Sequence, residues 1–216
     1  KIIEVAPPST TADTVAQHLV WTDPKSKRNV LRDILRHESV KNAVVFCNRK
    51  RDISILVKSL TSHGFSAVAL HGDMTQSARL EALQRFKDGE VPLMIASDVA
   101  ARGLDIAGLS HVFNFDVPSH AEDYVHRIGR TGRAGAAGNA VSLVSAEDVS
   151  LLKKIERLIK KQIVVKTCPE FKYQEVQQRS QPSKKKPVVN EKNKKNPSTN
   201  GQKKRWRPKF KSKHKR

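Results

Sequence analysis

Five short apolar runs, separated by segments of helical periodicity, constrain the fold of this 216-residue chain more than any other feature. The runs are rich in β-branched residues and barely alternate with polar residues, which is typical of strands buried on both faces of a parallel sheet. They span residues 44–47, 67–70, 93–96, 111–114 and 140–144. Residues 15–21 are interpreted either as a further strand or as part of a lead-in segment.

Between these runs, apolar residues recur at helical spacing in residues 27–37, 52–63 and 76–87. Two capping-box patterns, Ser119 with Glu122 and Ser145 with Asp148, each predict the start of another helix. Strands that alternate with helices over such short connections predict an α/β fold, in which a parallel sheet is flanked by helices on both faces. Ligands of such a sheet bind at the carboxyl ends of its strands.

The positive charge of the chain is concentrated at its C-terminal end. The formal net charge is +20, and Lys172 to Arg216 hold 17 Lys and Arg against two acids. A charge of one sign favours a polyanion such as nucleic acid as partner, and a solvated tail that keeps the chain soluble is the alternative. Because this segment lacks apolar periodicity, residues 172–216 are predicted to be a disordered basic tail.

Neither cysteine content nor hydropathy indicates a metal site or a membrane segment. Cys47 and Cys168 have no metal-ligand spacing and form no disulfide framework, so we expect no metal site and a reducing, cytoplasmic setting. No run of 18 apolar residues occurs, so we expect no membrane partner. Because the chain begins at Lys1 rather than Met, we expect it to be part of a longer protein.

Three polar segments follow the predicted strands, and each has a plain alternative. In the first, Gln76 and Arg79 lie one turn apart near a helix N-terminus, where amides and an arginine suit a phosphate backbone. Both could equally be ordinary surface residues. In the second, Ser97, Asp98 and Asp105 lie close to Arg102, and the two carboxylates are either functional, turn residues or partners of that arginine.

The third segment runs from His126 to Arg133 and carries three arginines at a spacing of three, interleaved with glycines. Arginines suit bidentate contacts with phosphate oxygens. The preceding helix should end near Gly129, which leaves Arg130 and Arg133 on a loop where they could stabilise charge on a transferred phosphoryl group. A solvated basic turn is the alternative.

Taken together, these segments resemble one protein family. "VVFCN", "LHGDMTQSARLEALQRFKDGE", "ASDVAARGLD" and "YVHRIGRTGR" occur in the order of motifs IV, IVa, V and VI of DEAD-box ATP-dependent RNA helicases. The resemblance covers about residues 1–158 and implies a RecA-like C-terminal helicase domain over 26–165. Residues 1–25 would lead in from a first lobe, and 172–216 would be an RNA-binding tail.

The resemblance also implies roles for single residues. Arg130 and Arg133 would be catalytic arginine fingers, and Gly103 and Asp105 would join them in binding ATP. The implied RNA-backbone contacts are Asn48, Gly72, Gln76, Arg79 and Ser97, of which Ser97 replaces the usual Thr and keeps its hydroxyl. Asp98, Arg102 and His126 would couple this lobe to the first one.

Two signatures of the first RecA-like lobe are absent from the sequence, namely the phosphate-binding G-x-x-x-x-G-K-[ST] loop and the D-E-A-D tetrapeptide. We therefore expect the Mg²⁺ ligands in that first lobe, and we expect this chain to be inactive alone. In the whole enzyme it would use ATP to unwind short RNA duplexes or remodel RNA–protein complexes, with ribosomal or RNA-decay partners compatible. The alternatives are a DNA-directed relative and a stand-alone RNA-binding or adaptor module without catalysis.

Overall fold

A seven-stranded sheet organises the part of the chain that the computed structural model describes, which is residues 15–104, 106–133 and 137–166. All of its strand pairs are parallel, and the strand order is β3-β4-β2-β5-β6-β1-β7. The strands are β1 (Val15–Trp21), β2 (Ala43–Phe46), β3 (Ala67–Leu70), β4 (Leu93–Ala96), β5 (His111–Asn114), β6 (Gly138–Val144) and β7 (Val164–Val165).

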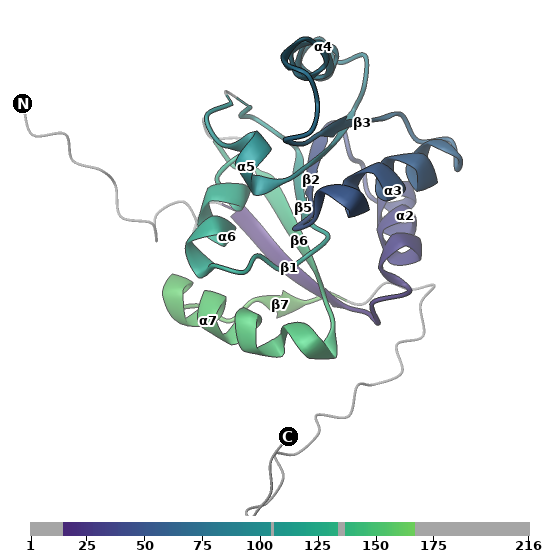
Figure 1. Cartoon of the computed structure of the whole chain (residues 1–216). Helices are drawn as coiled ribbons and strands as arrows, with labels where there is room; N and C mark the ends of the chain where they lie inside the picture. Colours follow the sequence, from purple (N-terminus) through teal and green to yellow (C-terminus); the bar gives the residue numbers. More distant parts are fainter. Residues whose placement is uncertain (1–14, 105, 134–136, 167–216) are drawn as a thin grey trace, which may run out of the picture. The chain divides into compact units, whose positions relative to one another are not determined.

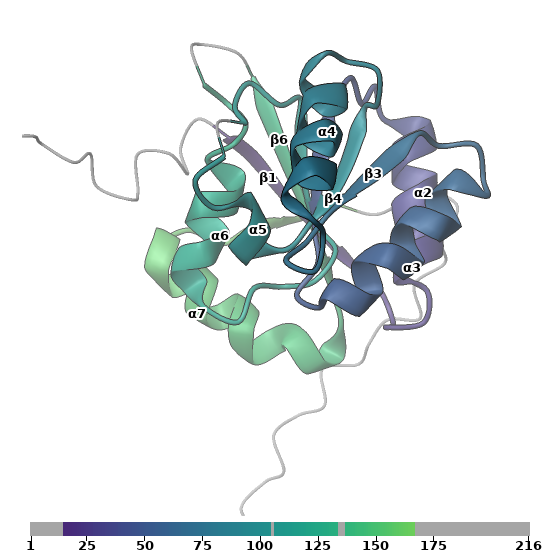
Figure 2. The same cartoon turned by 45° about the horizontal axis from the view of Figure 1, so that its top comes forward.

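Helices cover both faces of the sheet, as Figures 1 and 2 show. On one face lie α2 (Lys27–His37) and α3 (Lys50–Thr61). On the other face lie α4 (Gln76–Lys87), α5 (Asp98–Ala101), α6 (Ala121–Ile128) and α7 (Val149–Ile159), the last preceded by the 3₁₀ turn η1 (Ala146–Asp148). The predicted α/β fold class, a parallel sheet with helices on both faces, is confirmed.

The three adjacent strands β4, β2 and β5 are buried along their whole length. Their side chains alternate between two apolar clusters, so that Val45 and Phe113 pack under α2 and α3, whereas Val44 and Val112 pack under α4 and α5. Because both faces are covered, these strands are mostly apolar. The exceptions are His111 and Asn114 of β5, and both have polar partners, Glu38 for His111 and Ser142 and Arg127 for Asn114.

Most predicted elements are found where the sequence places them. The strands at 67–70, 93–96 and 111–114 and the helices at 27–37 and 76–87 are confirmed to the residue. The strand at 44–47 begins one residue earlier, and that at 140–144 begins at Gly138. The helix expected at 52–63 spans Lys50–Thr61. Residues 15–21 are a strand that pairs with β6 and β7, so the sheet begins before residue 26.

One of the two predicted capping boxes is wrong. The helix after Pro118 begins at Ala121 with His120 as its N-cap, and no side chain caps it. The Ser145 pattern is confirmed, because the Asp148 carboxylate accepts hydrogen bonds from the Ser145 backbone N–H at 2.9 Å and from its hydroxyl at 2.6 Å.

The predicted disordered tail, 172–216, lies outside the described residues. No helix in the described ranges is long and apolar enough to cross a membrane.

A polar cluster joins α2, β5 and the residue after β7. The Glu38 carboxylate accepts a hydrogen bond from Lys166 Nζ at 2.6 Å and lies 3.2 Å from Nε2 of the buried His111. The hydrogen bond from His111 is the main reason that the pKa of Glu38 falls to about 2. The ionised carboxylate is therefore preferred in the folded state.

We expect Glu38→Gln to lower the free energy of unfolding at pH 7 by about 1–2 kcal/mol, because it removes an ion pair that is only partly exposed. Since the pKa of Glu38 is lower in the folded state, its contribution is complete above about pH 4.5 and is lost as the pH falls toward 2. Urea unfolding across this range measures the effect, with the exposed Glu147→Gln as control. Equal losses in both variants at pH 7 would contradict the assignment.

Candidate functional site

The carboxyl ends of the adjacent strands β4, β2 and β5 bring three polar loops together. Asn48 follows β2, Asp98 follows β4 and Asp116 follows β5, and these strands are neighbours in the sheet. All three loops meet a single side chain, that of Arg127, which projects from the last turn of α6 and is 1% exposed. The site is built around this guanidinium.

Arg127 uses all five of its N–H donors within the domain. Nε and Nη2 donate to the two carboxylate oxygens of Asp98 at 2.6 and 2.7 Å, in a bidentate ion pair. Nη1 donates to Asn114 Oδ1 and to the Asp116 carbonyl oxygen, and Nη2 also donates to Asn48 Oδ1. The guanidinium also lies over the Phe46 ring, 5.0 Å from its centroid. A buried charge satisfied in this way fixes the relative positions of three strand ends.

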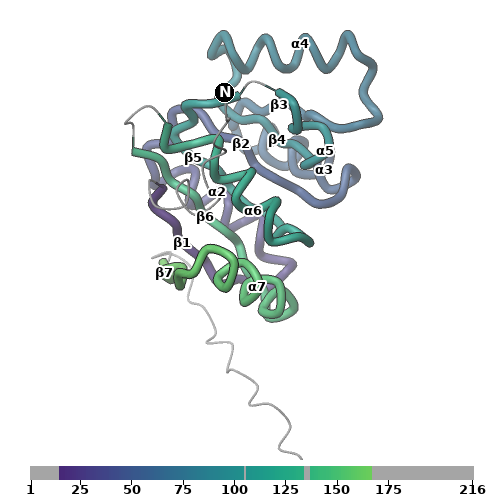
Figure 3. Tube along the Cα trace, turned by 90° about the vertical axis from the view of Figure 1, so that its left-hand side faces the viewer, coloured from purple at the N-terminus to yellow at the C-terminus, as the bar shows by residue number. Residues whose placement is uncertain are grey.

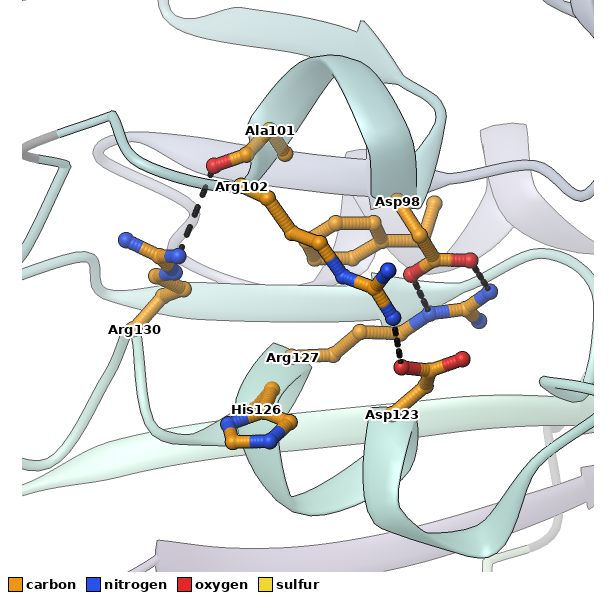
Figure 4. A pocket seen from close by; sticks show the side chains of 8 residues that line it. Asp98, Ala101, Arg102, Asp123, His126, Arg127 and Arg130 are labelled. Carbon is orange, nitrogen blue, oxygen red and sulfur yellow. Dashed lines mark hydrogen bonds and ion pairs between the residues drawn. The ribbon is translucent and has the colours of Figure 1, made fainter.

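A pocket opens beside this buried pair, between α5 and α6 (Figure 4). At its rim the exposed Arg102 forms an ion pair with Asp123, and His126 is exposed. Arg130 Nη1 donates to the Leu104 carbonyl oxygen at 2.7 Å, and its Nη2 lies 3.4 Å from the carbonyl oxygen of Ala101. The lining residues are Phe46, Asp98, Ala101, Arg102, Asp123, His126, Arg127 and Arg130.

The loop after α6 carries the remaining arginine. The helix ends at Ile128, and Gly129 caps it, as the sequence predicts. Arg133 is exposed, and its Nε donates to the Gly129 carbonyl oxygen at 2.6 Å. The Thr131 hydroxyl donates a hydrogen bond to the Leu109 carbonyl oxygen. A Cβ added to Gly138 would overlap the backbone nitrogen of Gly132. Residue 138 must therefore be glycine for the loop to lie against β6 in this way.

Of the residues expected to contact RNA, Asn48 follows β2, whereas the other four follow the neighbouring strands β3 and β4 and lie on the β3–α4 loop, on α4 or directly after β4. Gly72 and Gln76 are exposed, and Thr75 caps α4 by accepting from the Ala78 N–H. Arg79 Nη2 lies 3.4 Å from the Ala100 carbonyl oxygen, so α4 and α5 contact each other here. The N–H of Ser97 donates to the Leu70 carbonyl oxygen, which joins the ends of the two strands.

Comparison with known proteins gives this arrangement a family. Residues 26–135 match the family described as helicase conserved C-terminal domain. The DEAD-box ATP-dependent RNA helicase CshA of Geobacillus kaustophilus is 38% identical over 163 residues, which are 76% of this chain and 35% of that helicase. The chain belongs to the DEAD-box helicase C-terminal domains. It spans about a third of the length of the curated relatives that it matches.

Solved structures agree with this assignment and with the RecA-like fold. The DEAD-box protein SrmB of E. coli, crystallised with the regulator of ribonuclease activity A, is 39% identical with a TM-score of 0.67, over 70% of this chain and 90% of that one. S. cerevisiae Dbp5 bound to RNA and ADP BeF3 is 28% identical with a TM-score of 0.68, over 73% of this chain and 42% of that one.

Within this DEAD-box domain, the structure groups the predicted site residues unevenly. Asp98, Arg102, His126 and Arg130 line one pocket, whereas Arg133 lies on the adjoining loop. Gly103 is exposed next to the pocket rim, and Asp105 lies outside the described residues. The alternative that Asp98 pairs with Arg102 is wrong, because Asp98 pairs with Arg127 and Arg102 pairs with Asp123.

Sequence reasoning missed the structural role of Arg127. In the sequence, this residue is the first of three arginines at a spacing of three, and the spacing does not separate it from Arg130 and Arg133. One signal was available: Arg127 lies three residues after Tyr124 and one before Ile128, within the face of α6 that is buried. Asn48 also forms more hydrogen bonds within the domain than expected, because its side-chain amide donates to the Val117 carbonyl oxygen and accepts from Arg127.

We expect Arg127→Ala to lower the free energy of unfolding by about 3–5 kcal/mol, because it leaves the Asp98 carboxylate without its buried partner. Arg102→Ala is the matched control, since it also removes an Arg–Asp pair but its arginine is 62% exposed, and it should cost less than about 1 kcal/mol. Urea denaturation of both variants measures the difference. Similar losses would show that the buried pair does not organise the strand ends.

Proposed function

We propose that this domain supplies half of a composite ATP site and part of the RNA-binding surface of an ATP-dependent RNA helicase, which unwinds short RNA duplexes or remodels RNA–protein complexes. Membership of the DEAD-box family is the observation that carries the proposal. The relative Dbp5, of similar fold, was solved bound to RNA and ADP BeF3. ATP and RNA binding would close the two lobes, and hydrolysis would reopen them.

The pocket rim fits the phosphate end of a nucleotide. Arg130 donates a hydrogen bond to the Leu104 carbonyl oxygen and the exposed Arg133 donates one to that of Gly129, so each guanidinium is partly oriented before a ligand binds. As arginine fingers they would stabilise the charge that develops on the γ-phosphate. Gly103 has a φ of +73°, and open space surrounds the position that a Cβ would take there, which leaves room for the ribose; Asp105 would join it.

Mg²⁺ would accompany ATP and neutralise phosphate charge, and we assign its ligands to the first lobe. Among the described residues, no group of three or more His, Cys, Asp or Glu could hold a metal ion. The two arginines therefore need a partner lobe to act, and we expect the isolated chain to be inactive. Asp98, Arg102 and His126 line the same pocket and would couple the lobes.

RNA would lie along the carboxyl ends of β3 and β4. Gly72, Gln76 and Ser97 line this edge, and Arg79 adds the positive charge that a phosphate requires. Asn48 would contribute from the end of β2 while remaining bonded to Arg127. The basic segment 172–216 would add non-specific RNA affinity, and a cytoplasmic enzyme with ribosomal or RNA-decay partners is consistent with this proposal.

In the full-length enzyme, Arg130→Ala and Arg133→Ala should each reduce ATP turnover by on the order of 10³-fold, with little change in RNA affinity, because a finger acts chiefly on the transition state. Steady-state ATPase assays at saturating ATP and RNA measure turnover, and RNA titration measures affinity. Arg28→Ala, an exposed arginine of α2, is the control. Near-normal turnover in either variant would remove that residue from the catalytic assignment.

Arg79→Ala should weaken RNA binding by the closed, full-length enzyme about equally for RNAs of different sequence, because a backbone contact carries no base information. Arg85→Ala is a matched control on the same helix, where the arginine is exposed and pairs with Glu90. Fluorescence anisotropy with several single-stranded RNAs measures the affinities. A changed preference among sequences at constant mean affinity would contradict a backbone role.

A further inference from the structure

The outer surface of α7 and the turn after it forms a second cationic face, away from the pocket. Five basic side chains are exposed there: Lys153, Lys154, Arg157, Lys160 and Lys161. None of them forms an ion pair with another described residue. We call these five residues the α7 face. Its charge has no counterpart in the described domain, so an anionic partner would be favourable.

The helix is built so that these cations point outward together. Leu152, Ile155 and Ile159 recur at spacings of three and four and are buried against β1, β6 and α6. Glu156 is the one acidic residue of α7, and its carboxylate accepts from the Ile163 N–H at 3.1 Å. The negative charge is thus held toward the turn at residue 163, and the exposed face is left with cations.

The α7 face is separate from the proposed RNA edge at α4. Figures 1, 2 and 3 agree in placing α4 and α7 at opposite ends of the row of helices on one sheet face. The strands under α4 are β3 and β4, whereas β6 and β1 lie under α7, which is four strand spacings or roughly 20 Å away. One strand of RNA would have to cross the domain to reach both.

We propose that the α7 face binds the phosphate backbone of single-stranded RNA, as a second contact that holds the strand outside the α4 edge. Lys153 and Arg157 are one helical turn apart, so a row of cations follows the helix axis as successive phosphates follow a strand. The proposal rests on the function proposed above, because that function supplies the RNA.

RNA fits this face better than a lipid surface does. A helix that lies on a membrane needs an exposed apolar face, but the apolar face of α7 is already buried in the domain core. Among the large apolar side chains of α7, only Leu158 is exposed, at 37%. The sequence also continues into the strongly basic segment 172–216, so cations for the same polyanion follow directly along the chain.

The test compares two triple variants of the full 216-residue chain that lose the same charge. Lys153→Gln, Lys154→Gln and Arg157→Gln neutralise the α7 face with residues that keep helix propensity. Arg36→Gln, Lys41→Gln and Lys58→Gln neutralise three exposed cations on or beside α2 and α3. RNA affinity is measured over a salt series with a mixed-sequence single-stranded RNA, and melting temperatures confirm that both variants fold.

We expect the α7 variant alone to flatten the log–log salt dependence of RNA affinity by about two, since each phosphate contact with a single strand contributes roughly 0.7. Between 50 and 200 mM salt, affinity for the parent should therefore fall about 15-fold more than affinity for the α7 variant. Lys153→Arg with Lys154→Arg keeps the charge and should retain the parental slope, which tests the face without neutralising it.

Each other outcome overturns the inference in a recognisable way. Equal slopes in both triple variants would show that only net charge matters. If the α7 variant behaves as the parent while Arg79→Ala still weakens binding, the α7 face fails and the proposed function stands. If the parent chain binds no RNA, the α7 face fails, whereas the proposed function, which needs both lobes, is decided by RNA binding of the full-length enzyme. Loss of binding to phosphatidylglycerol vesicles in the α7 variant, with RNA binding unchanged, would assign the face to a lipid surface instead.

Discussion

The guanidinium of Arg127 is the constraint on which the rest of the site depends. Burying a charge is costly unless every donor is satisfied, and here five acceptors are supplied from the ends of three neighbouring strands. A one-residue shift of any of these strands would turn its acceptor away. The same side chain therefore stabilises the sheet and fixes α6, from which the loop with Arg130 and Arg133 begins.

The short helix α5 shows how this constraint extends to the pocket. Four residues make too little helix to be stable alone, so α5 depends on its contacts. Arg127 forms an ion pair with Asp98, the first residue of α5. Arg79 contacts the carbonyl oxygen of Ala100, and Arg130 contacts that of Ala101. Arginines of both proposed sites thus hold the same turn, so RNA bound at α4 and a nucleotide bound at the pocket would share a structural element.

Much of the fold could be predicted from the sequence, because burial on both faces leaves a strong local signal. The strands at 67–70 and 93–96 follow from continuous apolar runs, the strand at 111–114 from a shorter apolar pair between two polar residues, and the helix at 76–87 from periodicity. The two-residue strand β7 and the cap of α6 could not be predicted, because the first depends on pairing with β1 and the second on the path of the chain after Pro118. In the candidate site, four of the motif residues, Asp98, Arg102, His126 and Arg130, line one pocket. The spacing of the arginines does not by itself separate the buried Arg127 from the exposed Arg133, and the burial of one face of α6 does.

The position of the loop that carries Arg130 and Arg133 depends on the volume of the side chain at residue 138, which is uncharged. A methyl group there would need the space that the backbone of Gly132 occupies, so the loop and the first residue of β6 share one van der Waals boundary. Any larger residue at 138 would move the loop while leaving every arginine in the sequence. The positions of the Arg130 and Arg133 guanidiniums therefore depend in part on Gly138, a residue that has no side chain and no functional group of its own.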